Sequence, residues 1–182
     1  MKKLANVLAV MGAFALGVPN APAHATQSYE ARVTASAASR SAPADMITAF
    51  GTDQLKPNKY LWRNVPASAG PERIVISIGE QLAYFYRGDT LAGVASVSTG
   101  KEGKESPVGV FNVMFKKTMH RSRKYDNAPM PFSQFITDYG IALHAGHNPG
   151  EPASRGCIRL PSAFAKKLFN ATDVGTPVLI GA

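Results

Sequence analysis

The sequence has 182 residues, of which 20 are Lys or Arg and 12 are Asp or Glu, giving a formal net charge of +8 at neutral pH. A single cysteine, Cys157, excludes an intramolecular disulfide framework. The basic residues are scattered along the chain, so nucleic acid is not expected as a partner. Acidic polymers or anionic surfaces fit this charge better, and the alternative is a solvated basic surface without a partner.

Residues 1–25 are predicted to form a secretory signal peptide. Two lysines provide a short basic start, an apolar stretch follows over 4–18, and residues 23–25 match an A-x-A cleavage pattern. The apolar stretch is shorter than the ~20 residues that a membrane span needs, so an uncleaved anchor is the less favoured alternative. After cleavage before Thr26, 18 basic and 12 acidic residues leave a net charge of +6 and no transmembrane span. We expect an exported protein, periplasmic or associated with the cell wall.

Residues 26–71 are predicted to be a flexible tether followed by an N-terminal extension. Residues 26–45 are rich in Ala, Ser and Thr and have few bulky apolar groups, so we expect them not to fold by themselves. The segment 55–62 mixes polar and apolar residues and contains the single tryptophan, Trp62. We expect this segment to pack at the edge of the folded domain. The alternative is that Trp62 is a stacking platform for sugars.

From residue 72 to residue 181 the patterns predict one mainly β domain. Apolar runs of strand length alternate with turns rich in Gly and Pro, including Arg87-Gly88-Asp89. Strands are expected at 74–78, 82–86, 90–99, 108–118, 139–144 and 176–180. Short strands at this spacing are typical of a β-sandwich or barrel.

One helix is predicted, directly after the cysteine. Pro161 lies in its first turn, Phe164 and Leu168 fall on one face, and the pattern ends near Asn170. We expect this helix to brace the segment that contains Cys157.

A basic stretch at 120–125 precedes a proline-containing segment at 128–132. This long connection is either a lid that recognises substrate carboxylates or an exposed loop with solvated charges. Met130 and Phe132 either line a cleft or belong to ordinary packing.

Cys157 is a candidate nucleophile. A free thiol has a pKa of about 8.5 and is only slightly ionised near neutral pH, so it needs a base nearby. Histidine suits this task because it can take the thiol proton and return it to a leaving amine. Two histidines, His144 and His147, lie a short way upstream.

Of these two histidines, His144 is the better candidate for the base. Residues 139–144 alternate in the manner of a half-buried strand, which would hold His144 in place. His147 lies in the turn-forming sequence His-Asn-Pro-Gly, where its side chain would be less well held. Contact between His144 and Cys157 is plausible because the intervening segment contains several turn-forming residues.

The segment Ser154-Arg155-Gly156-Cys157 is predicted to be a tight turn that supports the chemistry. Gly156 permits backbone angles closed to other residues, so nearby amides could converge on a developing oxyanion. Arg155 and Arg159 would favour the thiolate and bind a substrate carboxylate.

The segment from His144 to Arg159 resembles the L,D-transpeptidase (YkuD-type) family, whose motif runs from a histidine to S/T-H-G-C-I/V-R. The similarity covers about residues 72–181. Further segments fall in the family's order: Ile74–Ile78, Val97–Lys101, Ser106–Phe111, Ala128–Pro131 and Gly175–Ile180.

This resemblance implies a YkuD-like β-sandwich or barrel with one short helix after the catalytic cysteine turn. It further implies that Cys157 is the nucleophile, His144 the base, and the amides near Gly156 and Cys157 the oxyanion hole. Two positions depart from the family pattern: Arg155 replaces the usual histidine, and Ala145 stands where many relatives have Gly-Thr. The first departure affects either the orientation of the turn or the ionisation of the thiol.

The expected function is that of an exported peptidoglycan L,D-transpeptidase without a cofactor or metal. Its partners would be peptidoglycan stem peptides, with a second stem's amine or an envelope protein's lysine as acceptor. With water as acceptor, the same site would be an L,D-carboxypeptidase. The alternatives from other classes are a non-catalytic wall-binding module, a structural protein with an inert cysteine, and a zinc site formed by His144, His147, Cys157 and His120.

Overall fold

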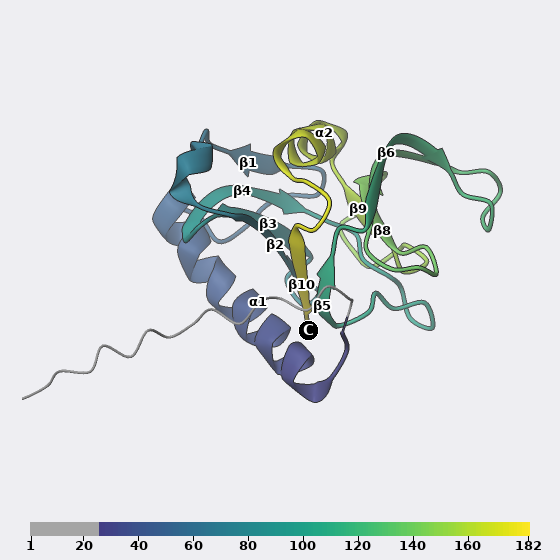
Figure 1. The fold of residues 1–182 in the computed structure, drawn as a ribbon, viewed down its shortest axis with the longest axis horizontal. Helices are drawn as coiled ribbons and strands as arrows, with labels where there is room; N and C mark the ends of the chain where they lie inside the picture. Colours follow the sequence, from purple (N-terminus) through teal and green to yellow (C-terminus); the bar gives the residue numbers. More distant parts are fainter. Residues whose placement is uncertain (1–25) are drawn as a thin grey trace, which may run out of the picture.

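The computed structural model describes residues 26–182, and the predicted signal peptide lies outside this range. Two β-sheets and two α-helices make up the described chain (Figure 1). The six-stranded sheet has the order β1-β4-β3-β2-β10-β5, and the four-stranded sheet has the order β6-β7-β8-β9. The mainly β fold class is therefore confirmed.

The elements have the following bounds. The six-stranded sheet consists of β1 (Tyr60–Trp62), β2 (Glu72–Ser77), β3 (Leu82–Arg87), β4 (Thr90–Ser96), β5 (Gly109–Asn112) and β10 (Pro177–Gly181). The four-stranded sheet consists of β6 (Phe115–Arg121), β7 (Pro129–Phe135), β8 (Ala142–Ala145) and β9 (Ile158–Leu160). The α-helices are α1 (Tyr29–Phe50) and α2 (Ser162–Ala171), and a short 3-10 turn covers Ala67–Ala69.

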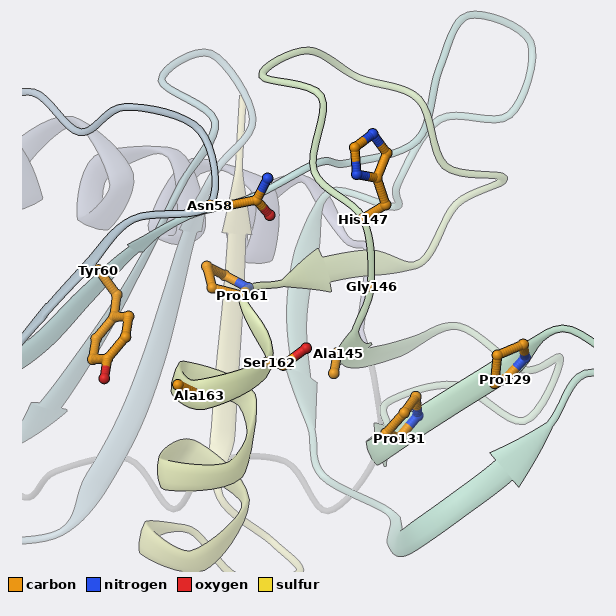
Figure 2. A pocket seen from close by; sticks show the side chains of 10 residues that line it. All are labelled: Asn58, Tyr60, Pro129, Pro131, Ala145, Gly146, His147, Pro161, Ser162 and Ala163. Carbon is orange, nitrogen blue, oxygen red and sulfur yellow. The ribbon is translucent and has the colours of Figure 1, made fainter.

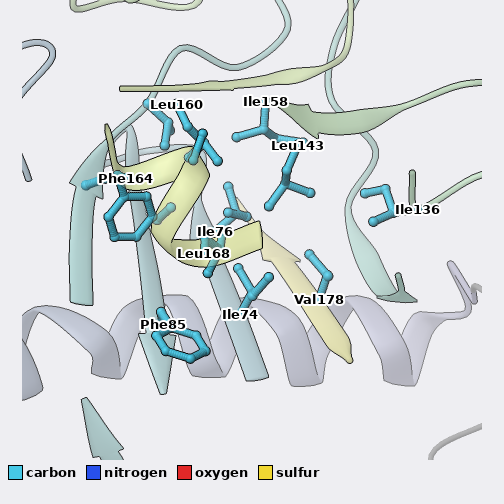
Figure 3. Packing of buried hydrophobic residues seen from close by; sticks show 14 of the residues in the cluster. Ile74, Ile76, Phe85, Ile136, Leu143, Ile158, Leu160, Phe164, Leu168 and Val178 are labelled. Carbon is cyan, nitrogen blue, oxygen red and sulfur yellow. The ribbon is translucent and has the colours of Figure 1, made fainter. Parts of the chain in front are cut away.

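The main core lies between the six-stranded sheet, α2 and the strands β8 and β9 (Figure 3). Ile74 and Ile76 of β2 point into this core, while Val75 between them packs on the opposite face of the sheet with α1. Because both faces of the sheet are covered, its central strands are apolar nearly throughout. The predicted helix after the cysteine is confirmed as α2, and it buries Phe164 and Leu168 as expected.

Helix α1 contradicts the prediction of a flexible tether over residues 26–45. Ser28 caps its first turn by accepting a hydrogen bond from the Ala31 amide at 3.2 Å, and Gly51 ends it in the left-handed region with φ +73°. Its buried stripe consists mostly of small residues: Ala31, Ala35, Ser39, Ala42 and Met46.

Small residues on both sides let α1 pack closely on the sheet. A Cβ atom at Gly181 of β10 would lie 2.3 Å from Ser39 Oγ and 2.6 Å from the Ala35 carbonyl oxygen. Alanine is also the best helix former. The composition that suggested disorder is thus the composition that allows this close packing.

Two strand predictions also need correction. The run 108–118 is not one strand, because it divides into β5 and β6, which belong to different sheets. The segment 139–144 is not half-buried, because all four residues of β8 are buried and the strand begins only at Ala142. Both faces of β8 are covered: Leu143 packs in the main core with α2, and Ala142 on the opposite face packs with Met130 and Phe135.

The N-terminal extension is an integral part of the sheet. Strand β1 pairs with β4 in antiparallel register, with Trp62 opposite Gly93. The Trp62 ring stacks on Phe85 at 5.3 Å between centroids and meets the edge of Phe164 at 5.7 Å. Trp62 therefore packs at the edge of the domain, as the sequence predicts. Within residues 26–182, neither helix is both long and apolar enough to cross a membrane.

Candidate active site

The parallel pair β8 and β9 brings His144 and Cys157 to the same cleft. His144 is in register with Arg159, and Cys157 lies two residues before Arg159, directly ahead of β9. In a regular parallel pair, with strands about 4.8 Å apart and a rise of about 3.3 Å per residue, two residues offset in this way have Cα atoms about 8 Å apart. Both side chains line one cleft of about 900 Å³.

The ring of His144 is held in one tautomer by its own strand. Its Nδ1 atom lies 2.8 Å from the carbonyl oxygen of Ala145, and the side chain is buried, with 7% of its surface exposed. A carbonyl oxygen can only accept a hydrogen bond, so Nδ1 holds the proton of the neutral ring and Nε2 keeps its lone pair. The arrangement makes Nε2 the basic atom.

The pKa of His144 is lowered from its ordinary value. Burial is the main cause, and the nearby charges of Arg159 and His120 add to it, while the hydrogen bond to Ala145 opposes it. A lowered pKa keeps the ring neutral near pH 7. His144 is therefore available as a proton acceptor.

The pKa of the Cys157 thiol is raised, which differs from the expectation that arginines would favour the thiolate. Burial is the largest effect and outweighs the backbone hydrogen bond at Ala142 and the charge of Arg159, which both lower the pKa. The thiol Sγ also lies 3.8 Å from the Gly140 carbonyl oxygen, as a donor. The resting cysteine is protonated, and a base is needed to activate it.

A closed set of hydrogen bonds shapes the turn before Cys157. The buried Ser154 hydroxyl donates to the Cys157 carbonyl oxygen at 2.5 Å and accepts from the Gly156 amide at 3.1 Å. Gly156 has φ +109°, and a Cβ atom there would lie 2.8 Å from Ile141 Cδ1. Because the Gly156 amide is engaged by Ser154, the Cys157 amide is the better candidate for an oxyanion donor.

A second layer behind this turn was not foreseen from the sequence. The buried Ser106 hydroxyl accepts from the Gly100 amide and donates to the Gly156 carbonyl oxygen, both at 2.9 Å. The Ser154 amide donates to the Thr99 carbonyl oxygen at 3.0 Å. The segments 97–101 and 106–111, which were part of the family resemblance, thus buttress the cysteine turn, and their fixed order was the available signal.

The two arginines have different surroundings. The Arg155 side chain is exposed, and its guanidinium carbon lies 4.6 Å from the centre of the Tyr125 ring, in the loop between β6 and β7. Arg159 is half-buried and packs along Gly146, where a Cβ atom would lie 3.1 Å from its Cγ. Both line the cleft with Cys157.

Met130 lines the same cleft but is 93% buried, and it forms a small cluster with Phe135 and Ala142 on which Cys157 packs. It is therefore part of the wall under the sulfur. Phe132 packs against the main core instead of lining this cleft.

His147 is exposed at the rim, where the main cleft meets a second hollow of about 610 Å³ (Figure 2). Asn58 and Tyr60 from the N-terminal extension and the first residues of α2 line this second hollow. The Asn58 side chain donates to the Asn148 carbonyl oxygen at 2.8 Å, so the extension fastens the loop after His144. The sequence predicted neither this second hollow nor the hydrogen bond between Asn58 and Asn148.

The zinc hypothesis finds no support in the geometry. Over residues 26–182, no three or more His, Cys, Asp or Glu side chains are grouped so that they could hold a metal ion. The histidine, the thiol and the turn instead form an arrangement suited to acyl transfer through a cysteine.

Comparisons with known proteins concern the domain as a whole. A family model described as the L,D-transpeptidase catalytic domain, YkuD, matches residues 71–180. No curated protein sequence matches the chain.

Similar solved structures include three L,D-transpeptidases. The one from Stackebrandtia nassauensis has a TM-score of 0.58 and 20% identity, covering 75% of this chain and 64% of that one. The one from Xylanimonas cellulosilytica has a TM-score of 0.54 and 25% identity, covering 65% and 64%. L,D-transpeptidase 3 from Mycobacterium tuberculosis, in complex with a faropenem-derived adduct, has a TM-score of 0.56 and 22% identity, covering 62% and 60%. The chain spans about three-fifths of the length of these structures.

Proposed function

Since the chain belongs to the L,D-transpeptidase catalytic domain family, we propose that it is an exported peptidoglycan L,D-transpeptidase in which Cys157 is the nucleophile and His144 the base. The observation that supports this most directly is that a thiol with a raised pKa and an imidazole with a lowered pKa line the same cleft. His144 has Nδ1 engaged by Ala145 and Nε2 left as the basic atom, in the cleft that Cys157 also lines.

In the first half-reaction, the carbonyl carbon between the third residue of a stem tetrapeptide and its terminal D-alanine is attacked. His144 Nε2 takes the Cys157 proton as Sγ forms a bond to this carbon. The resulting oxyanion is stabilised by the Cys157 amide. When the carbon–nitrogen bond breaks, Nε2–H gives its proton to the nitrogen, which leaves as the amine of D-alanine. A thioester on Cys157 remains.

In the second half-reaction, an amine replaces the sulfur. The acceptor is the side-chain amine of a second stem or a lysine of an envelope protein. Its nitrogen attacks the thioester carbon while Nε2 takes one of its protons, and the carbon–sulfur bond then breaks. The proton returns to Sγ, which restores the thiol and leaves a new amide. With water in place of the amine, the product is a free carboxylate and the enzyme acts as an L,D-carboxypeptidase.

The positions around the reacting pair have supporting roles. Ser154 and Gly156 fix the turn that presents the thiol, and Met130 forms the wall beneath it. Arg159 is suited to bind a substrate carboxylate next to the scissile bond, because it lies in register with His144. Arg155, which replaces the family's usual histidine, contacts Tyr125 instead of either reacting group. Its departure from the pattern therefore leaves the proton transfers intact.

A covalent-labelling experiment tests the nucleophile. The solved Mycobacterium tuberculosis relative is in complex with a faropenem-derived adduct, so a β-lactam of the penem or carbapenem class is a suitable acylating probe. Intact mass spectrometry of the mature chain should show one adduct after treatment, and Cys157→Ala should show none. An adduct on both proteins, or on neither, would contradict the assignment.

A turnover experiment tests the reaction itself. A stem tetrapeptide incubated with the protein and an amine acceptor should release D-alanine and yield the cross-linked amide, both absent with Cys157→Ala. If D-alanine is released and the tripeptide acid is the sole product at high acceptor concentration, the protein is a carboxypeptidase. If Arg155→His gains activity that the natural chain lacks, the protein is a wall-binding module.

A further inference from the structure

The cleft around Cys157 is much more basic than the protein as a whole. Its lining includes six Lys or Arg residues and one acidic residue, Asp126, although the full chain has 20 basic and 12 acidic residues. The six are Lys101, Lys117, Arg123, Lys124, Arg155 and Arg159. Most of the excess positive charge of the chain is therefore concentrated at one site.

Three of these cations belong to the hairpin β6–β7, which extends away from the body of the protein (Figure 1). We call Lys117, Arg123 and Lys124 the cationic hairpin. Lys117 lies on β6, and the other two lie in the loop before β7. Two backbone hydrogen bonds close this loop: the Ser122 amide donates to the Ala128 carbonyl oxygen at 3.0 Å, and the Ala128 amide donates to the Tyr125 carbonyl oxygen at 2.9 Å. The charges thus sit on an ordered hairpin that lines the cleft.

The cationic hairpin faces the turn that contains Cys157. Tyr125 in the hairpin loop lies against Arg155, which is two residues before the thiol. The side chains of Lys117, Arg123 and Lys124 are exposed. None of the three takes part in an ion pair, because the pairs found in residues 26–182 are Arg73–Asp89 and Arg87–Glu72, both outside the cleft. The hairpin charges are therefore available to an anionic ligand.

The charges of the hairpin act on a neighbouring side chain of the same cleft. The pKa of His120 on β6 is lowered by burial first and then by the charges of Lys117 and Arg123. Clefts lined by one sign of charge attract ligands of the opposite sign. The ligand that fits is a peptide with carboxylates beyond the one at its C-terminus.

We propose that the cationic hairpin selects donor stem peptides whose side-chain carboxylates are free, against peptides in which these groups are carboxamides. This inference rests on the proposed function, because it concerns the donor of the same reaction. A carboxylate and a carboxamide have nearly the same shape, so the discrimination is electrostatic. It follows that the preference weakens as salt is added, since the Debye length falls from about 10 Å at 0.1 M to about 3 Å at 1 M.

The experiment compares two synthetic tetrapeptides that differ only in their side-chain carboxyl groups, which are free carboxylates in one and carboxamides in the other. Binding to Cys157→Ala gives a dissociation constant without turnover, and thioester formation by the natural chain gives kcat/KM. We expect about a ten-fold preference for the free carboxylates at low ionic strength in both measurements, given three exposed charges of modest individual effect. The preference should fall to about two-fold or less at 1 M salt.

Substitution locates the effect. The triple variant Lys117→Gln, Arg123→Gln and Lys124→Gln should bind the two peptides equally within about two-fold. The matched control Arg40→Gln, Lys56→Gln and Lys166→Gln removes the same number of lysines and arginines from exposed positions outside the cleft and should keep the full preference. The salt series on the natural chain gives the same test without any substitution.

The outcomes separate this inference from the proposed function. Equal affinity for both peptides, a preference that persists at 1 M salt, or an unchanged preference in the hairpin variant would each overturn the inference. Thioester formation at equal rates from both donors would leave the transpeptidase proposal standing and remove the selectivity. A clear binding preference with no thioester from either donor would contradict the transpeptidase proposal and leave the binding selectivity standing.

Discussion

The two sheets differ in how many of their faces are covered. The six-stranded sheet packs against α1 on one face and against the main core on the other, so β2, β3 and β4 are buried over most of their length. In the four-stranded sheet, β6 is largely exposed, and one face of β8 and β9 opens into the cleft. We call the six-stranded sheet the frame, because it supports the fold. The side of the four-stranded sheet that faces the cleft is called the reactive face. Substitutions in the two should therefore separate stability from activity.

The largest expected effect is on the reactive face. His144→Gln keeps a side chain that can donate to the Ala145 carbonyl oxygen but has no basic nitrogen, so thioester formation should fall by about 10²- to 10⁴-fold. His147→Gln is the matched control, because His147 is exposed at the rim, and its rate should stay within about three-fold of the natural chain. Single-turnover acylation measures both. A larger loss in the His147 variant would reverse the assignment of the base.

The next effect concerns the turn, where frame and reactive face meet. Gly156→Ala adds a Cβ atom that would lie 2.8 Å from Ile141 Cδ1 at a φ of +109°, so the turn must shift and take the thiol with it. We expect acylation to slow by about 10- to 100-fold, since small displacements of a reacting atom are costly. Gly103→Ala has a similar positive φ of +70° with nothing within 4 Å, and it should keep its acylation rate. Equal losses in both would mean that backbone strain alone is responsible.

On the frame, the expected effect is on stability and not on chemistry. Gly181→Ala pushes a Cβ atom into Ser39 and Ala35 of α1, and we expect about 1–3 kcal/mol less free energy of unfolding. Gly79→Ala, with no atom within 4 Å, is the control. Denaturant unfolding of both measures the difference. An unaffected Gly181 variant would indicate that α1 does not pack on the sheet in solution, which would restore the tether hypothesis.

The sequence could predict the parts of this comparison that depend on local pattern. The apolar strands β2, β3 and β10 and the helix α2 follow from short-range spacing. Residue chemistry also selects His144 and Cys157 as the candidate pair, and both line one cleft. Helix α1 was missed because its buried stripe, with Ala35 and Ala42, lacks the bulky residues that mark an amphipathic helix.

The division of 108–118 was missed for a related reason. Val113 is buried and Met114 is exposed, yet both are apolar, so the pattern does not show where the chain passes from one sheet to the other. In the site, the contacts made by Ser106, Asn58 and Gly140 join residues distant in sequence, and local pattern does not contain them. The raised pKa of Cys157 depends on burial, which only the assembled fold determines.

The smallest expected effect is in the pH dependence of His144 and Cys157. It tests whether burial in the cleft keeps both groups neutral. The active form has neutral His144, whose pKa is lowered below 6.5, so kcat/KM should fall only as the pH drops below 6.5. The pKa of Cys157 is raised above 9.0, so alkylation by iodoacetamide should be slow at pH 7 and should rise with a midpoint above pH 9.0. Because the chain has one cysteine, the alkylation rate reports on Cys157 alone.

An acid limb centred above pH 6.5 together with a thiol that titrates below pH 9.0 would mean that a thiolate and an imidazolium are already paired at rest. In that case proton transfer would precede substrate binding, and burial would not be what sets the chemistry of this cleft.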